Sequence, residues 1–377
     1  MNDKIWLSSP HMGGTELNYI NEAFKENWVA PLGPNVNNFE NDIKDYLDHN
    51  VEVAALSAGT AALHLALIIL GVKRDDQVIC QTFTFSASAN PILYVGAEPV
   101  FIDSEKETWN MCPKALEQAI EAGMKQGKKP KAIIVVHLYG MPAKMQEILE
   151  IANRFEIPLI EDAAEALGST YKDQKCGTFG EMSILSFNGN KIITTSGGGA
   201  LVCNTKEEKE KAVFLSTQAR DQAPHYQHSE VGYNYRMSNI SAGIGRGQME
   251  VLDDRVTARR NNNHFYQEVF KEFPGVNVFV EPNADYFSNH WLSAVEINPD
   301  IAGFNREDLR LAFEKENIES RPLWKPMHLQ PVFVNSSYYG GTVAEKLFDN
   351  GLCLPSGSSL TDVDRKRIKS VILTFKK

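Results

Sequence analysis

Short apolar runs alternate with helical patterns through the first two-thirds of the chain. Strands are predicted at 51–57, 77–82, 99–102, 132–137 and 158–161, and helices between them at 60–70, 86–95, 113–122 and 144–155. Because these strands are almost continuously apolar, each is expected to be buried on both faces. The pattern predicts an α/β fold with a mostly parallel central sheet covered by helices.

The regular alternation of strand and helix patterns ends after Met182. Residues 183–187 and 200–204 predict two strands on either side of a glycine-bearing loop, and helical patterns follow at 207–217 and 238–273. Further on come short strand patterns at 276–280 and 291–297, a helix pattern at 306–317 and proline-rich loops. We therefore predict a large α/β domain over residues 1–250 and a smaller C-terminal α+β domain over residues 251–377.

The charge balance narrows the classes of partner. Lys and Arg number 38 and Asp and Glu 48 among 377 residues, a formal net charge of −10. Such a chain is not expected to bind nucleic acid, because little positive charge is left to neutralise phosphates. The uncharged stretch 53–72 has the length of a membrane span but contains the turn-forming sequence SAGT, so we predict no membrane segment.

The cysteines and the first residues indicate the compartment. Five cysteines are scattered without a CxxC pair, and no signal-peptide pattern opens the sequence. This pattern predicts reduced thiols in a cytoplasmic protein and no metal site. The pair of histidines in HYQH, residues 225–228, lacks the further ligands that zinc requires.

The first candidate for chemistry is the segment SAGTA, residues 57–61, between a predicted strand and a helix. Free N–H groups at a helix N-terminus attract anions. Gly59 would let the backbone approach a phosphate closely, and the Thr60 hydroxyl would add a hydrogen bond. The alternative is an ordinary helix cap formed by Ser57 or Thr60, and the segment alone favours that reading.

The second candidate is Asp162, which follows the strand pattern at 158–161. An acid at the carboxyl end of a parallel strand can face a ligand pocket, because ligands of such sheets bind at that edge. The alternative is again a helix cap, a common role for aspartate.

The third candidate is Lys191, in the loop of SFNGNKIITTSGGGAL at 186–201. A lysine held in a dry pocket has a lowered pKa and becomes nucleophilic. The alternative is a solvated loop lysine, as most lysines are.

Together the three segments offer a phosphate cradle, an acid for a ring nitrogen and an amine for an aldehyde. Those are the groups that a protein supplies to pyridoxal phosphate. Lys191 would then form the Schiff base, Asp162 would keep the pyridine nitrogen protonated, and Phe85 would cover the ring. Core packing is the alternative for Phe85.

The motifs that carry these residues resemble those of the sugar-nucleotide aminotransferases of the DegT/StrS type. The similar segments are SAGTAALHLAL, EDAAEALG, SFNGNKIITTSGGGALV and GYNYRMSN, and they follow the family order over nearly the whole chain. The resemblance implies the fold of type I pyridoxal phosphate enzymes, like that of aspartate aminotransferase.

The resemblance also implies roles for single residues. Lys191 and Asp162 match the catalytic lysine and acid of the family. Asn234 matches an asparagine that reaches the phosphate from a neighbouring subunit, which implies a homodimer with shared sites. The cofactor-binding set that the resemblance implies is Gly59, Thr60, Phe85, Asp162, Glu165, Ser186, Asn188, Lys191 and Asn234.

The segments HMGGTE, NWVAPLGPN and RPLWKPMH look closest to a branch that aminates UDP-4-keto-6-deoxy-N-acetylglucosamine for bacterial surface glycans. Basic and aromatic residues near these motifs could hold a diphosphate. A solvated surface cluster is the alternative for each of them. The candidates are Arg220, His225, Tyr226, Arg321, Lys325 and His328.

The resemblance implies transamination in two half-reactions with L-glutamate as donor and ping-pong kinetics. One alternative is the same chemistry on a GDP- or dTDP-linked ketosugar. Another, from a different class, is a non-catalytic protein with this fold that senses a sugar nucleotide. The complete set of Lys191, Asp162 and Ser186 argues against the sensor.

Overall fold

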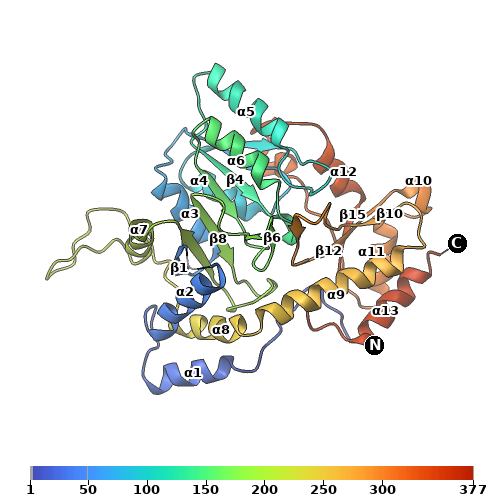
Figure 1. Ribbon diagram of the computed structural model, residues 1–377, viewed down its shortest axis with the longest axis horizontal. Coiled ribbons are helices and arrows are strands. Elements are labelled where there is room, and N and C mark those ends of the chain that lie inside the picture. The colour runs from blue at the N-terminus through green and yellow to red at the C-terminus, as the bar shows by residue number, and fades with distance from the viewer. Residues whose placement is uncertain (1–2, 49, 377) are drawn as a thin grey trace.

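The computed structural model describes residues 3–48 and 50–376, and a large twisted sheet forms its centre (Figure 1). Neighbouring strands are parallel from β8 to β14, whereas β9 is antiparallel to both β1 and β8. The predicted mostly parallel sheet is therefore confirmed. In spatial order the strands are β1 (Glu52–Leu56), β9 (Gly199–Cys203), β8 (Met182–Ser186), β5 (Leu159–Asp162), β4 (Ala132–Val136), β2 (Gln77–Gln81), β3 (Glu98–Ile102) and β14 (Ser337–Tyr339).

Helices bury both faces of this sheet. Alternate side chains of β1 enter different cores: Leu56 packs in one and Ala55 in the other. One face is covered by α3 (Gly59–Ile69), α4 (Asn90–Tyr94) and α7 (Lys206–Ser216). The opposite face is covered by α2 (Pro34–Tyr46), α5 (Pro113–Lys125) and α6 (Met145–Arg154).

The region expected to be helical over 238–273 is helical over most of its length, but it is divided into two helices. They are α8 (Asn239–Met249), which packs against α2 and α1 (Glu16–Lys25), and α9 (Leu252–Phe270). Val251 between them leaves the helical conformation, with φ −118° and ψ 10°. Gly245 lets α8 approach α2 closely, since a Cβ there would lie 2.6 Å from the Phe39 ring.

The helix expected over 86–95 is also interrupted. A short 3-10 turn over Ser86–Ser88 precedes α4, and Ala89 separates the two. This break turns Ser88 toward the end of β5, where its hydroxyl meets Asp162.

A smaller antiparallel sheet follows, in the order β10 (Val276–Val278), β12 (Ser293–Ile297), β15 (Gly351–Leu354) and β13 (Arg321–Pro322). Its core includes side chains of α9, α11 (Arg306–Lys315) and α13 (Asp362–Leu373). Short helices α10 (Pro299–Ala302) and α12 (Val343–Asn350) and a three-stranded ribbon, β11 (Tyr286–Phe287), β6 (Thr170–Tyr171) and β7 (Gln174–Lys175), complete the fold.

Two segments cross the division predicted at residue 250. Ile5, near the N-terminus, packs in the core of the small sheet, and β14 extends the large sheet. In the described part of the chain, no helix combines the length and the apolar character needed to cross a membrane.

Candidate active site

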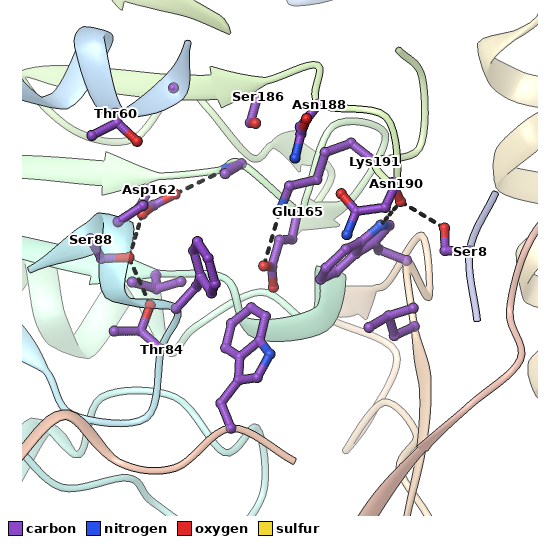
Figure 2. A pocket seen from close by; sticks show the side chains of 18 of the residues that line it. Ser8, Thr60, Thr84, Ser88, Asp162, Glu165, Ser186, Asn188, Asn190 and Lys191 are labelled. Carbon is purple, nitrogen blue, oxygen red and sulfur yellow. Dashed lines mark hydrogen bonds and ion pairs between the residues drawn. The ribbon is translucent and has the colours of Figure 1, made fainter. Parts of the chain in front are cut away.

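A cavity of about 590 Å³ opens at the carboxyl ends of β5 and β8, at the edge where ligands of parallel sheets bind (Figure 2). Its walls come from the large sheet, from α3 and from the segments around Trp291 and Trp324. Of the residues predicted from the sequence, nine line it: Gly59, Thr60, Phe85, Asp162, Glu165, Ser186, Asn188, Lys191 and Arg321.

Lys191 reaches the cavity from the loop between β8 and β9. Its side chain is 12% exposed, and its Nζ atom lies 3.2 Å from Oε1 of Glu165. The same Nζ atom lies 4.1 Å from the centre of the Trp291 ring. A solvated loop lysine is therefore excluded: the amine is enclosed between a carboxylate and an aromatic face.

Glu165 is buried opposite this lysine. Its Oε2 atom accepts a hydrogen bond from the Tyr139 N–H at 2.8 Å. Burial raises the pKa of the Glu165 carboxyl to about 7, although the nearby Lys191 amine and the Tyr139 N–H oppose that rise. The Glu165 carboxyl therefore takes up its proton at a pH near neutral.

Asp162 ends β5 with its side chain in the cavity. Its carboxylate accepts hydrogen bonds from the Ser88 hydroxyl at 2.7 Å and from the Ala164 N–H at 3.1 Å. Ser88 is in turn 2.7 Å from the Thr84 hydroxyl, so a short chain of polar groups orients the acid (Figure 2). Burial raises the pKa of Asp162, and both hydrogen bonds oppose the rise.

The N-terminus of α3 forms the other end of the cavity. The N-cap residue is Ala58, and no side chain caps the helix, so the cap by Ser57 or Thr60 is excluded. The backbone of Gly199 passes so close that a Cβ there would lie 2.3 Å from the Gly59 nitrogen. Uncapped N–H groups therefore lie beside the Ser186 side chain, and such groups at a helix N-terminus attract anions.

These groups fit pyridoxal phosphate. An uncapped helix N-terminus suits its phosphate, a buried carboxylate its ring nitrogen, and an enclosed lysine amine its aldehyde. The three lie on the wall of one cavity, as Figure 2 shows for Thr60, Asp162 and Lys191.

The remaining predicted residues lie outside the cavity of this chain. Asn234 is exposed on the strand bridge that it forms with Thr217. The Arg220 guanidinium lies 4.4 Å from the centre of the Tyr226 ring, in the exposed segment that projects beyond α7 (Figure 1). His225 and Lys325 are also exposed.

The His328 ring is engaged by its neighbours. Its Nδ1 atom is 2.7 Å from the Thr82 hydroxyl, and its Nε2 atom is 3.2 Å from a Glu345 carboxylate oxygen. The ring stacks on Tyr338 with centroids 3.9 Å apart. This histidine therefore fixes the loop after Trp324, whereas Arg321 lines the cavity and pairs with Glu319 at 2.8 Å.

Sequence reasoning missed several cavity residues, among them Ser8, Ser88, Asn190, Trp291, Glu319 and Trp324. Trp291 and Trp324 stand in the motifs NHWL and RPLWKP, and a tryptophan next to such polar residues was the available signal. Nothing in the sequence linked Trp291 to the loop of Lys191, because the two are brought together by tertiary packing.

Within the described ranges one buried group could be taken for a metal site: His137, Glu161 and Cys176. The Nδ1 atom of His137 accepts the Ala143 N–H at 3.0 Å, which leaves the ring proton on Nε2. That nitrogen lies 3.0 Å from Glu161, whose carboxylate also receives N–H groups of Gly177 and Phe179. Backbone N–H groups thus hold the Glu161 carboxylate and the His137 ring in place at β5.

Comparison with known proteins agrees with the resemblance to the DegT/StrS type that the sequence motifs show. The sequence profile of the DegT/DnrJ/EryC1/StrS aminotransferase family matches residues 10–373. The chain is 51% identical over 377 residues to the Bacillus subtilis (strain 168) protein named "Putative pyridoxal phosphate-dependent aminotransferase EpsN", covering 99% of this chain and 96% of that protein. It is 38% identical to GDP-perosamine synthase of Escherichia coli O157:H7, covering 95% and 94% of the two chains.

A solved structure is similar over the same length. The crystal structure of a DegT DnrJ EryC1 StrS aminotransferase from Brucella abortus matches with a TM-score of 0.88 and 32% identity. The match covers 96% of this chain and 95% of that one. The fold predicted from the sequence is thereby confirmed.

Proposed function

The chain belongs to the DegT/DnrJ/EryC1/StrS aminotransferase family, and we propose on that premise that it moves the amino group of L-glutamate to the C4 ketone of a nucleotide-linked 4-keto-6-deoxy sugar. The product would serve bacterial surface glycan synthesis in the cytoplasm. The observation that carries the proposal is the enclosed amine of Lys191, which shares one cavity with Asp162 and the uncapped end of α3.

The cofactor of this family is pyridoxal phosphate, which supplies an aldehyde that reacts with amines and a ring that accepts electrons. In the proposal, the first turn of α3 at Gly59 and Thr60 binds the phosphate together with Ser186. Asp162 holds a proton on the ring nitrogen, which its buried carboxylate favours through charge. Phe85 covers one face of the ring, and Asn188 lies on the adjoining wall.

Lys191 is assigned two tasks. Its amine anchors the aldehyde between turnovers, and once released it carries a proton to and from the substrate carbon as general base and acid. Glu165 supports both tasks, because a carboxyl with a pKa of about 7 at 3.2 Å can take up or return the proton of the amine. Trp291 and Trp324 line the cavity, and their apolar rings would keep water away from the reacting groups.

For the acceptor we propose UDP-4-keto-6-deoxy-N-acetylglucosamine, which the motifs NWVAPLGPN and RPLWKPMH support. Arg321 on the cavity wall is the first candidate for its diphosphate, and Lys325, exposed in the same motif, is the second. A GDP-linked ketosugar is the second candidate, because the GDP-perosamine synthase of Escherichia coli O157:H7 is 38% identical over 95% of this chain.

We further propose a homodimer in which each copy completes the other's site. Asn234 is exposed and lies away from the cavity of its own chain, as a residue that serves a neighbour would. Tyr226 and Val231, on the same projecting segment, are 78% and 80% exposed, which is unusual for large apolar side chains. Arg220 and His225 would enter the partner's acceptor site with this segment.

A substrate panel tests the proposal. Purified protein with pyridoxal phosphate and L-glutamate is offered UDP-, GDP- and dTDP-linked 4-keto-6-deoxy sugars, and the amino sugar is measured by mass. Turnover of the UDP sugar at least tenfold above the others, with parallel double-reciprocal lines, is expected. Equal turnover of all three would remove the preference for UDP, and no turnover of any would leave the sensor as the better account.

A further inference from the structure

Arg259, on α9, is a buried cation whose hydrogen bonds go to neutral oxygens. Its side chain is 1% exposed, and no carboxylate is among its partners in the part of the chain that the structure describes. The guanidinium donates to the carbonyl oxygens of Trp291 at 2.5 Å, Ser356 at 3.3 Å and Lys191 at 3.4 Å, and to the Ser8 hydroxyl at 3.0 Å. An unpaired buried charge is costly and needs a physical reason.

Two of these carbonyl groups belong to the residues whose side chains meet in the cavity. The Lys191 amine lies 4.1 Å from the centre of the Trp291 ring. Arg259 thus binds the backbone carbonyl groups of Lys191 and Trp291, whereas the side chains of these two residues contact each other in the cavity. The backbone of a loop and that of a distant segment are fixed relative to one another by one planar group.

The contacts close into a ring. The Ser8 hydroxyl, which accepts from Arg259, donates to the Asn190 carbonyl oxygen at 2.6 Å. The same oxygen accepts the indole N–H of Trp291 at 2.7 Å. Arg259, Ser8, Asn190 and Trp291 therefore form a closed circuit of hydrogen bonds around the residue before Lys191, part of which is visible in Figure 2.

A lysine at position 259 could not form this arrangement. A guanidinium presents several N–H donors in one rigid plane, whereas an ammonium offers three on a single flexible point. Burial lowers the pKa of Arg259 to about 9, so the group stays charged at neutral pH.

We propose that Arg259 is a positioning residue for Lys191: it holds the lysine loop against Trp291 so that the amine meets Glu165. The inference rests on the proposed function, in which Lys191 is the catalytic lysine. It predicts that loss of the guanidinium frees the amine without removing any group that touches substrate or cofactor.

The first test uses cofactor-free protein and reads the lysine itself. Native protein is treated briefly with acetic anhydride, and acetylation of Lys191 is measured by peptide mass spectrometry. In Arg259→Lys and Ser8→Ala the rate is expected to rise at least threefold over wild type. Arg255→Gln is the matched control, because Arg255 also donates to carbonyl groups, those of His11 and Met12, but contacts neither Lys191 nor Trp291.

The second test uses protein loaded with pyridoxal phosphate. The rate at which L-glutamate bleaches the visible absorbance, per bound cofactor, is expected to fall roughly 10- to 100-fold in Arg259→Lys. Trp291→Phe, which loses the indole N–H and keeps a ring, is expected to give a non-additive effect in the double variant. The pH dependence of the absorbance should shift in both single variants and stay unchanged in Arg255→Gln.

Unchanged acetylation of Lys191 in both Arg259→Lys and Ser8→Ala would overturn the inference, even if both variants melt at lower temperature. If Arg259→Lys does not fold, Ser8→Ala and Trp291→Phe decide the question, since Ser8 lies at the edge of the ring. The acetylation test needs no cofactor, so it separates a failure of this inference from a failure of the proposed function.

Discussion

The Nζ atom of Lys191 lies 3.2 Å from the Oε1 atom of Glu165, and the two side chains are 12% and 4% exposed. The pair joins the loop after β8 to the turn after β5, so the acid and the amine come from neighbouring parallel strands. Burial favours the neutral form of the Glu165 carboxyl, whereas its contact with the Lys191 amine favours the charged form. Burial has the larger effect, so the pKa of Glu165 is raised to about 7.

The raised pKa of Glu165 predicts that the stability of the cofactor-free protein depends on pH. The folded pKa of Glu165 lies above its ordinary value of 4.5, so the folded state binds the proton more tightly than the unfolded state. Its contribution to the free energy of unfolding is therefore lost as pH rises from about 4.5 to about 7, by up to about 3 kcal/mol. The free energy of unfolding is measured with urea for Glu165→Gln and for wild type at pH 5 and at pH 8. The difference, variant minus wild type, should be larger at pH 8.

The control is Glu150→Gln, at an exposed position on α6. Its stability relative to wild type should be the same at both pH values. A Glu165→Gln difference that does not change with pH would show that Glu165 has no raised pKa in the folded protein.

The orientation of Asp162 gives a second prediction. Removing the Ser88 hydroxyl takes away a 2.7 Å hydrogen bond that favours the carboxylate. Ser88→Ala should therefore lower kcat by about tenfold while the protein stays folded and binds cofactor. Asp162→Asn should lower it much further. Retention of full kcat in Ser88→Ala would contradict the orienting role, and steady-state kinetics with circular dichroism measure both.

The close approach at Gly199 gives a third. A Cβ at this position would lie 2.3 Å from the Gly59 nitrogen, so Gly199→Ala must push the strand away from the start of α3. We expect about 1–3 kcal/mol lower stability and a weaker affinity for pyridoxal phosphate. In Gly197→Ala the added Cβ meets nothing within 4 Å, and the unfolding midpoint should stay in place. Equal midpoints for the two variants would contradict the close contact.

The fourth prediction concerns the proposed homodimer, in which each copy completes the active site of the other. Lys191→Ala and Asn234→Ala homodimers should each be inactive or strongly impaired. Co-refolding equal amounts should restore about a quarter of wild-type activity, because half of the dimers are mixed and each mixed dimer has one intact site. Mixtures no more active than their components would place Asn234 at the site of its own chain, or at none.

The sheet and the ends of its strands could be predicted, because continuous apolar runs identify buried strands without knowledge of their neighbours. Asp162, Lys191 and Gly59 follow such runs, and the structure places all three on the wall of one cavity. Helices α1 and α2 were not predicted; α2 is rich in Asn and Asp, whose helical preference is weak.

The rest of the site depends on contacts between distant segments. Ser8 and Asn190 are 182 residues apart, and Trp291 and Asn190 are 101 apart. No local pattern reports such pairs. The motif RPLWKPMH drew attention to His328, whereas its neighbour Trp324 lines the cavity, because the direction of each side chain is set by the packing of the loop.

The most direct test of the central claim is the visible spectrum of wild-type protein and Lys191→Ala after pyridoxal phosphate is added, before and after L-glutamate. We predict a yellow wild-type protein that glutamate bleaches and a UDP-4-keto-6-deoxy sugar restores. Lys191→Ala should retain the cofactor but show no turnover. A wild-type protein that stays colourless, or a Lys191→Ala variant with wild-type rates, would contradict the assignment of Lys191.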